Sequence, residues 1–88
     1  MYRDLYSEEL TRKLAKLKKK DSAHYSRVRR KMDSILSAPT HSHKFLSHDM
    51  KGCNRVHIGH FVLVFRIDHQ KKTVSFEDYD HHDVIYRK

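Results

Sequence analysis

The spacing of the hydrophobic residues changes from a helical period to a strand period about halfway along the chain. In the first half, Leu10, Leu14 and Leu17 recur at intervals of four and three residues, with basic residues between them. Such spacing places apolar side chains on one face of an amphipathic helix. Ser7 is a suitable N-cap, and the lysines at 18–20 place positive charge at the C-terminal end, where the helix dipole favours it. These signals predict a first helix, preceded by a short strand at residues 2–6.

A second helix is predicted from Asp21 or Ser22 up to the residues before Pro39. Either polar residue can act as N-cap, and a proline disfavours helix at the residue before it. Because only a short polar link separates the two helices, they should form a hairpin, and neither would be stable without packing on another element. The apolar stripe of the second helix consists of Tyr25, Val28, Met32, Ile35 and Leu36.

In the second half of the chain the hydrophobic positions alternate with a period of two, which is typical of strands. Three strands are predicted, at residues 55–58, 61–67 and 73–79. Gly59 and the residue after it permit a tight reversal between the first two strands, and residues 68–71 form the second turn. The three strands should therefore be antiparallel neighbours.

The order of these elements predicts an α+β fold in a single domain covering residues 1–88. An N-terminal strand and a helical hairpin would pack on an antiparallel β-sheet, in the order β-α-α-β-β-β, with the helices on one face. Residues 38–51 would form a loop, and residues 80–88 a helical turn or a short strand. The face without helices would carry cationic side chains such as Arg55 and His57.

Positive charge is the main compositional feature. The 88 residues have a formal net charge of +8, and nine histidines can add charge as the pH falls. This excess favours an anionic partner, either nucleic acid or an acidic protein, although solubility alone is a simpler reason. No run approaches the ~20 apolar residues of a membrane span, and no secretory signal is recognised. Together with the single cysteine, Cys53, this predicts a cytoplasmic protein without a membrane partner.

Much of the positive charge lies in the two predicted helices. Ten lysines and arginines occur between Arg12 and Lys31, with few acidic residues placed to pair with them four residues away. Such a surface would contact RNA phosphates without sequence preference, whereas the simpler interpretation is a solvated helix face. The residues predicted to bind RNA here are Lys16, Lys19, Arg27, Arg30 and Lys31.

Two segments carry a resemblance to a known family, GCNRVHIGHFVLVFRID at 52–68 and DHHDVIY at 80–86. With the order of elements, they resemble the RelE/ParE superfamily of toxin–antitoxin toxins. Those chains have a basic strand R-V-R-V-G, an aromatic-Arg-aliphatic strand and a closing H-R-x-x-x-Y. The resemblance implies a toxin that cuts ribosome-bound messenger RNA without a metal or other cofactor. Its implied partners are a cognate acidic antitoxin, the ribosome and messenger RNA.

The resemblance also assigns site residues. Cleavage by the ribose 2′-hydroxyl needs a base, an acid and a cation near the phosphate. Matched by position, Arg55 and His57 correspond to the two basic residues of the first motif. His81, His82 and Tyr86 correspond to the closing motif. These five are the predicted catalytic residues, and ordinary surface polarity is the alternative interpretation.

One position departs from the family pattern. Where the second strand should carry an arginine, the chain has Val62, which cannot bind a phosphate. Arg66 lies about 13 Å farther along the same strand, and His60 lies nearer, in the turn. With Lys51, which precedes the first strand, these two complete the predicted RNA contacts.

Two other functions remain open. One is a ParE-like inhibitor of DNA gyrase, which would have no need of the titrating histidines at 57, 81 and 82. The other is a basic RNA- or ribosome-binding module without catalysis, which the valine at 62 would favour.

Two clusters carry weaker signals. His41, His43 and His48 do not make a complete zinc site, because such sites usually bring four ordered ligands, and no metal site is predicted. The acidic residues near the end of the last strand could hold His81 or His82 in the charged form, or form a solvated strand end. They are Glu77, Asp78, Asp80 and Asp83.

Overall fold

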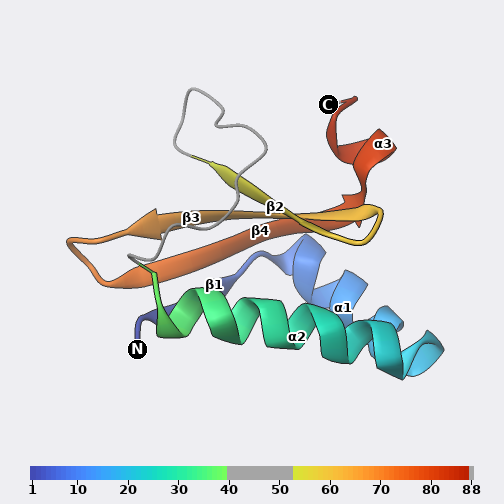
Figure 1. The fold of residues 1–88 in the computed structure, drawn as a ribbon, viewed down its shortest axis with the longest axis horizontal. Coiled ribbons are helices and arrows are strands. Elements are labelled where there is room, and N and C mark those ends of the chain that lie inside the picture. Colours follow the sequence, from blue (N-terminus) through green and yellow to red (C-terminus); the bar gives the residue numbers. More distant parts are fainter. Residues whose placement is uncertain (40–52, 88) are drawn as a thin grey trace.

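The structure, a computed structural model, describes residues 1–39 and 53–87 and confirms the predicted α+β fold (Figure 1). The predicted loop lies mostly outside these residues, as does Lys51, one of the predicted RNA contacts. Within the described ranges, no helix is both long and apolar enough to cross a membrane. The elements are β1 (Arg3–Tyr6), α1 (Glu8–Lys20), α2 (Ser22–Ser37), β2 (Asn54–Ile58), β3 (Phe61–Asp68), β4 (Thr73–His81) and α3 (His82–Ile85).

The four strands form one sheet in the order β1-β4-β3-β2. The last three strands are the predicted antiparallel meander, while β1 joins the edge of β4 in parallel, so the sheet is mixed. The turn between β2 and β3 has two residues, and Gly59 adopts a φ of +62° there, which glycine does without steric cost. This tight turn fixes the register in which His57 lies opposite Val62.

A bulge in β4 reverses its alternation. Val64 pairs with Asp78 and Phe65 with Phe76, so Glu77 is an extra residue on β4. As a result Phe76 and Tyr79, three residues apart, both lie on the helix face, whereas strict alternation would have separated them. Asp78 then lies opposite Val64 on the other face.

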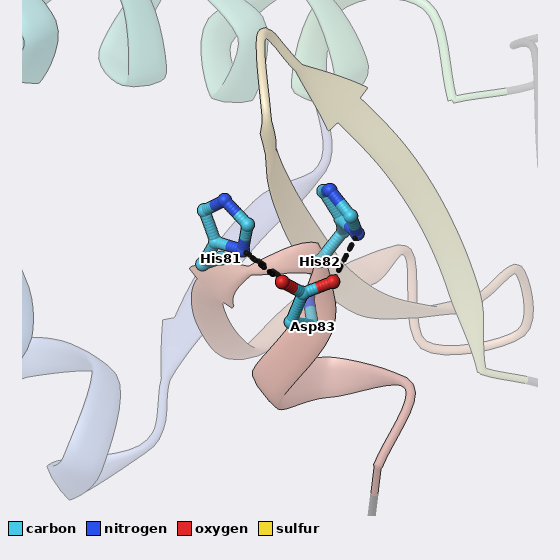
Figure 2. Close-up of side chains that lie close together, drawn as sticks. All are labelled: His81, His82 and Asp83. Atoms are coloured by element: carbon cyan, nitrogen blue, oxygen red, sulfur yellow. Dashed lines mark hydrogen bonds and ion pairs between the residues drawn. The ribbon is translucent and has the colours of Figure 1, made fainter.

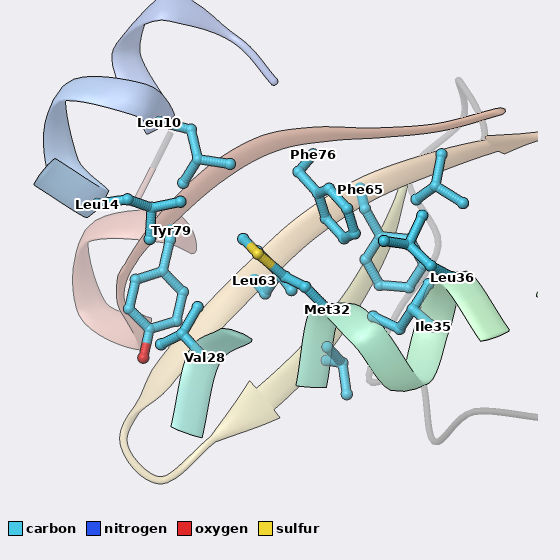
Figure 3. Close-up of a cluster of buried hydrophobic side chains, with 12 residues drawn as sticks. Leu10, Leu14, Val28, Met32, Ile35, Leu36, Leu63, Phe65, Phe76 and Tyr79 are labelled. Atoms are coloured by element: carbon cyan, nitrogen blue, oxygen red, sulfur yellow. The ribbon is translucent and has the colours of Figure 1, made fainter. Parts of the chain in front are cut away.

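The helices α1 and α2 cover one face of the sheet and bury the main core (Figures 1 and 3). Their predicted stripes are confirmed, since Leu10, Leu14 and most of the second stripe are buried. Figure 3 shows side chains of both helices meeting those of β3 and β4. The buried core comprises Leu10, Leu14, Val28, Met32, Ile35, Leu36, Val56, Leu63, Phe65, Val74, Phe76 and Tyr79.

A buried histidine that the sequence interpretation did not place also lies in this core. His24 is on α2, four residues before Val28, and its Nε2 lies 2.6 Å from the Tyr79 hydroxyl. Burial raises the pKa of Tyr79, so the hydroxyl keeps its proton and can donate it to the imidazole. His24 also meets the ring of Phe61 edge-on, at 4.7 Å between centroids. His24 lies four residues before Val28, and this helical spacing could have predicted that it faces the core.

The other face of the sheet is less open than predicted. Val62 and Val64 are buried there together with Cys53 and Ile85, and α3 lies on the opposite side of the sheet from α1 and α2 (Figure 1). The expectation of a face left bare for cations was therefore wrong in part. The reason is visible in β3, whose first five residues are all apolar, and such a run requires cover on both faces.

Candidate functional site

Four histidines from three elements and a turn meet at one end of the sheet. His57 is on β2, His60 is in the following turn, His81 ends β4 and His82 begins α3. The ring centroids of His57 and His82 are 6.5 Å apart and nearly parallel, at 11°. His60 lies 6.3 Å from His81 and 6.4 Å from His82. The backbone N–H of His82 donates to the His60 carbonyl at 3.0 Å, which ties the turn to the start of α3.

Asp83 lies between the two consecutive histidines (Figure 2). Its carboxylate oxygens are 3.0 Å from Nδ1 of His82 and 3.6 Å from Nδ1 of His81. The backbone N–H of Asp83 donates to Nδ1 of His81 at 3.2 Å, so this nitrogen acts as an acceptor and Nε2 carries the proton. At His82 the nearby carboxylate favours a proton on Nδ1, which leaves Nε2 as the acceptor. The two imidazoles thus present opposite groups at Nε2.

Arg55 and Tyr86 form a second pair beside the histidines. The guanidinium carbon of Arg55 lies 5.3 Å from the centre of the Tyr86 ring, which is a cation–π contact. Arg55 and His57 are two residues apart on β2 and so project from the same face. His82 and Tyr86 are four residues apart across α3, a spacing that places them on one side of a helical turn.

These five predicted catalytic residues are therefore brought to one end of the sheet. Two rows run side by side, Arg55 and His57 on the strand, and Tyr86 and His82 on the helical turn. His81 extends the cluster toward the helix side, where its ring meets Phe61 edge-on at 5.7 Å. Their chemical roles stay predictions. Among the RNA contacts predicted outside the helices, His60 lies within the same cluster.

Val62 lies beneath these rows and is fully buried. It pairs with His57 on one side and with Asp80 on the other, and it packs with Ile85 of α3. An arginine at this position would have to displace Ile85. Valine in place of the family's arginine therefore allows an apolar contact with Ile85, which holds α3 on the sheet.

Arg66 is not brought to the histidine cluster. It pairs with Ser75 near the far end of β3, and its Nε lies 3.8 Å from the Glu77 carboxylate. Arg66 and Val62 are thus as far apart along β3 as the sequence suggested. Their partners on β4, Ser75 and Asp80, are five residues apart.

Asp78 and Asp80 of β4 contact a helix lysine rather than a histidine side chain. Nζ of Lys13 lies 2.7 Å from Asp78 and 2.9 Å from Asp80. Partial burial opposes charge on both partners, but their hydrogen bonds and attraction prevail, raising the pKa of Lys13 and lowering the pKa of Asp80. The backbone N–H of His81 also helps to lower the pKa of Asp80. Of the acidic cluster, Asp83 is the member placed against His81 and His82.

The basic residues of the helices lie in a different layer from the histidine cluster. Four of the five predicted RNA-binding side chains on α1 and α2 are exposed, and the fifth is half-buried. Ion pairs four residues apart join Lys13 to Glu9 at 3.4 Å and Arg29 to Asp33 at 3.7 Å, so pairing is less scarce than the sequence suggested. The residues concerned are Lys16, Lys19, Arg27, Arg30 and Lys31.

Comparisons with known proteins place this arrangement in a family. No family model matches the chain. A protein of Methanocaldococcus jannaschii named "Putative toxin RelE4" is 43% identical over 89 residues, covering 100% of this chain and 94% of that protein. An uncharacterized protein of Methanosarcina mazei is 48% identical over 79 residues, covering 89% of this chain and 91% of that protein. The chain belongs to the RelE family of toxins, which confirms the resemblance noted in its sequence.

Solved structures share the fold at low identity. The isolated RelE toxin of E. coli gives a TM-score of 0.77 at 16% identity, covering 99% of this chain and 98% of that chain. A chain of the intact E. coli RelBE toxin–antitoxin complex also gives a TM-score of 0.77, at 17% identity, covering 92% of this chain and 96% of that chain. At these identities the likeness supports the architecture of the chain.

Proposed function

We propose that this chain is the toxin of a toxin–antitoxin pair and that it cleaves messenger RNA on the ribosome without a metal. Family membership supports the toxin class. The observation that carries the chemistry is the nearly parallel pair of His57 and His82, 6.5 Å apart and flanked by Arg55 and Tyr86. Because each ring can hydrogen-bond over about 2.6–3.2 Å, two rings this close can contact one phosphodiester together.

The proposed reaction is an internal transfer. The 2′-oxygen of a ribose attacks the adjacent phosphorus, and the bond from phosphorus to the 5′-oxygen breaks. The products are a 2′,3′-cyclic phosphate and a free 5′-hydroxyl. One group must take the 2′ proton, another must protonate the leaving 5′-oxygen, and a cation must offset the charge that develops on the phosphate oxygens.

The hydrogen bonds within the cluster support an assignment of these roles. His82 is the proposed base, because Asp83 favours a proton on its Nδ1 and leaves Nε2 to accept one. His57, on strand β2, is the proposed acid and would act in its charged form. Arg55 is the proposed cation, and the ring of Tyr86 positions its guanidinium. His81 can donate from Nε2 to a phosphate oxygen, since its Nδ1 already accepts from Asp83.

The basic surface of α1 and α2 is the proposed ribosome contact. Its exposed lysines and arginines lie across the sheet from Arg55 and His57, so ribosomal RNA could be held on one side while messenger RNA meets the other. The net charge of +8 also suits an acidic antitoxin that folds on binding. A cytoplasmic location follows from this proposal.

Replacement of His82 by asparagine tests the proposed chemistry. We expect wild-type expression to arrest growth and leave truncated transcripts, and His82→Asn to lose both while still sedimenting with ribosomes. His69→Asn is the matched control, because His69 is exposed in the turn after β3, at the opposite end of the sheet from His82. Growth arrest with intact transcripts would contradict nuclease action.

Burial of Val62 favours a second candidate, a ribosome-binding module without catalysis. Where the family pattern has an arginine, this chain has Val62, which is buried against Ile85. This position therefore supplies no cation to the phosphate. On this alternative, His82→Asn and His57→Asn would weaken binding to ribosomes to the same degree as they weaken growth arrest. Loss of growth arrest with unchanged ribosome binding would exclude this alternative.

A further inference from the structure

We propose that His81, His82 and Asp83 form a binding site for Zn²⁺, and that zinc bound there switches off the proposed RNA cleavage. The binding itself rests on the geometry of the three side chains. The inhibition also rests on the proposed function, and the experiment below separates the two.

The ligand atoms already lie close to the positions that a zinc ion requires. Two atoms bound to zinc at about 2.0–2.1 Å in a tetrahedron are about 3.3 Å apart. Here Oδ1 of Asp83 lies 3.0 Å from Nδ1 of His82, and the other carboxylate oxygen, Oδ2, lies 3.6 Å from Nδ1 of His81. One ligand atom from each of the three residues lies within 4.8 Å of the others. Figure 2 shows both imidazole Nδ1 atoms turned toward the carboxylate.

The chemistry of the ligands favours zinc over magnesium or calcium. Two imidazole nitrogens and one carboxylate oxygen match the two-histidine, one-carboxylate sets of zinc sites, whereas magnesium and calcium prefer oxygen alone. Three protein ligands leave a fourth position for water or for a further imidazole. The His60 ring lies 6.3 Å from the His81 ring and 6.4 Å from the His82 ring, which makes it a candidate for that position.

The backbone supports the site. His81 ends β4 and His82 begins α3, and the N–H of His82 is anchored to the His60 carbonyl at 3.0 Å. Arg87 Nε donates to the Asp83 carbonyl at 3.2 Å. These bonds fix the backbone that carries two of the three ligands, His82 and Asp83. Zinc on Nδ1 of His81 would replace the hydrogen bond from the Asp83 N–H, so one weak bond is exchanged for a metal bond.

Zinc at this site would disable the proposed base. A metal ion on Nδ1 of His82 requires that the remaining proton of the neutral ring lie on Nε2. Nε2 is then a donor and can no longer accept the 2′ proton. Asp83 would bind the metal and no longer hold the reactive tautomer. Zinc is therefore expected to lower cleavage rather than support it.

Zinc affinity of the full 88-residue chain, made by chemical synthesis without a histidine tag and refolded, tests the binding. Zn²⁺ is titrated against a chromogenic zinc chelator at pH 7. We expect Asp83→Asn and His82→Asn each to weaken binding about tenfold or more. The control variants Asp33→Asn and His69→Asn, which change an exposed carboxylate on α2 and the far turn, should bind zinc as the wild type does.

The rival location is the group His41, His43 and His48, which lies outside the described residues. The triple variant of these histidines should retain the wild-type affinity. The proposal is overturned if the triple variant loses zinc binding, or if Asp83→Asn and His82→Asn bind as tightly as the wild type.

Cleavage in a translation extract tests the inhibition. The ratio of cleavage with and without micromolar Zn²⁺ should fall at least severalfold for the wild type and recover with a zinc-selective chelator. For Asp83→Asn the same ratio should stay near one, whatever its basal rate. Zinc binding at the site with an unchanged wild-type ratio would overturn the inhibition. If the chain cleaves no RNA, the proposed function fails while the titration still decides the zinc site.

Discussion

On one face of the sheet α1 and α2 bury a layer of large apolar side chains, whereas on the other α3 covers only a patch around Val62 and Val64. The first face contains most of the buried apolar side chains of the described residues and should contribute most of the stability. The second contains a few apolar contacts, but these place His82 and Tyr86 beside His57 and Arg55. Changes to the first face should therefore act on folding, and changes to the second on the geometry of the candidate site.

The largest effect is expected from Phe65→Ala in the main core. Phe65 is fully buried on the helix face and packs against Phe76. Its removal should lower the free energy of unfolding by about 3–5 kcal/mol, which is a large part of the stability of a small domain. Urea denaturation followed by circular dichroism measures this. A loss below about 1 kcal/mol would mean that the helix face does not dominate stability.

Ile85→Ala should have a smaller effect on stability and a larger one on the site. Ile85 is buried under α3 against Val62. We expect a loss of about 2 kcal/mol, at the low end for such truncations because the cluster is small. Transcript cleavage should fall much further than the folded fraction, since α3 carries His82. If activity follows the folded fraction alone, α3 does not position the site.

Lys13→Met probes a contact that joins α1 to β4. The loss of the ammonium leaves Asp78 and Asp80 without their shared partner, at an expected cost of about 1 kcal/mol at pH 7, modest because the pair is partly exposed. The pKa of Asp80 is lowered in the folded state, so its contribution is complete above about pH 4 and is lost as the pH falls through the lowered value.

Urea unfolding of wild type and Lys13→Met at pH 7 and pH 3 checks this, with Lys19→Met as the control on the same helix. The difference between wild type and Lys13→Met should shrink at pH 3. A difference that grows in acid would contradict the assigned direction of the pKa shift.

The smallest effect is expected at Tyr86, which is 44% exposed. Tyr86→Phe keeps the ring under Arg55 and should leave stability and RNA cleavage nearly unchanged. Tyr86→Ala removes the cation–π contact, worth about 0.5–1 kcal/mol at an exposed position, and should slow cleavage severalfold. Equal losses in both variants would indicate that the hydroxyl, rather than the ring face, is the active part of the side chain.

The helix stripes were predictable because they depend on local spacing. Leu10, Leu14, Val28, Met32, Ile35 and Leu36 are buried as their periodicity indicates. For the candidate site, the sequence named five residues that the fold brings close together, but it did not indicate their arrangement. The motif named Arg55, His57, His81, His82 and Tyr86, while the parallel stacking of His57 on His82 depends on a β2–β4 arrangement that no local pattern specifies.

Asp83 shows most clearly what the sequence did not indicate about the site. In the sequence it is one of four acidic residues near the end of β4, and nothing local separates it from Asp78 or Asp80. The bulge at Glu77 places Tyr79 on the same face as Phe76, so Asp78 and Asp80 lie on the other side of β4, where Lys13 from α1 contacts them. Asp83 follows the end of the strand and lies against the two histidines instead.

From its own order of residues this chain specified two amphipathic helices, a meander of strands and a reserve of imidazole and guanidinium groups, because each of these depends on neighbours a few positions apart. The meeting of residues 55, 57, 82 and 86 was decided only in three dimensions. It required a tight glycine turn, one extra residue in the last long strand, and Ile85 anchored on Val62, since strand register and the docking of a short helix depend on contacts between distant segments.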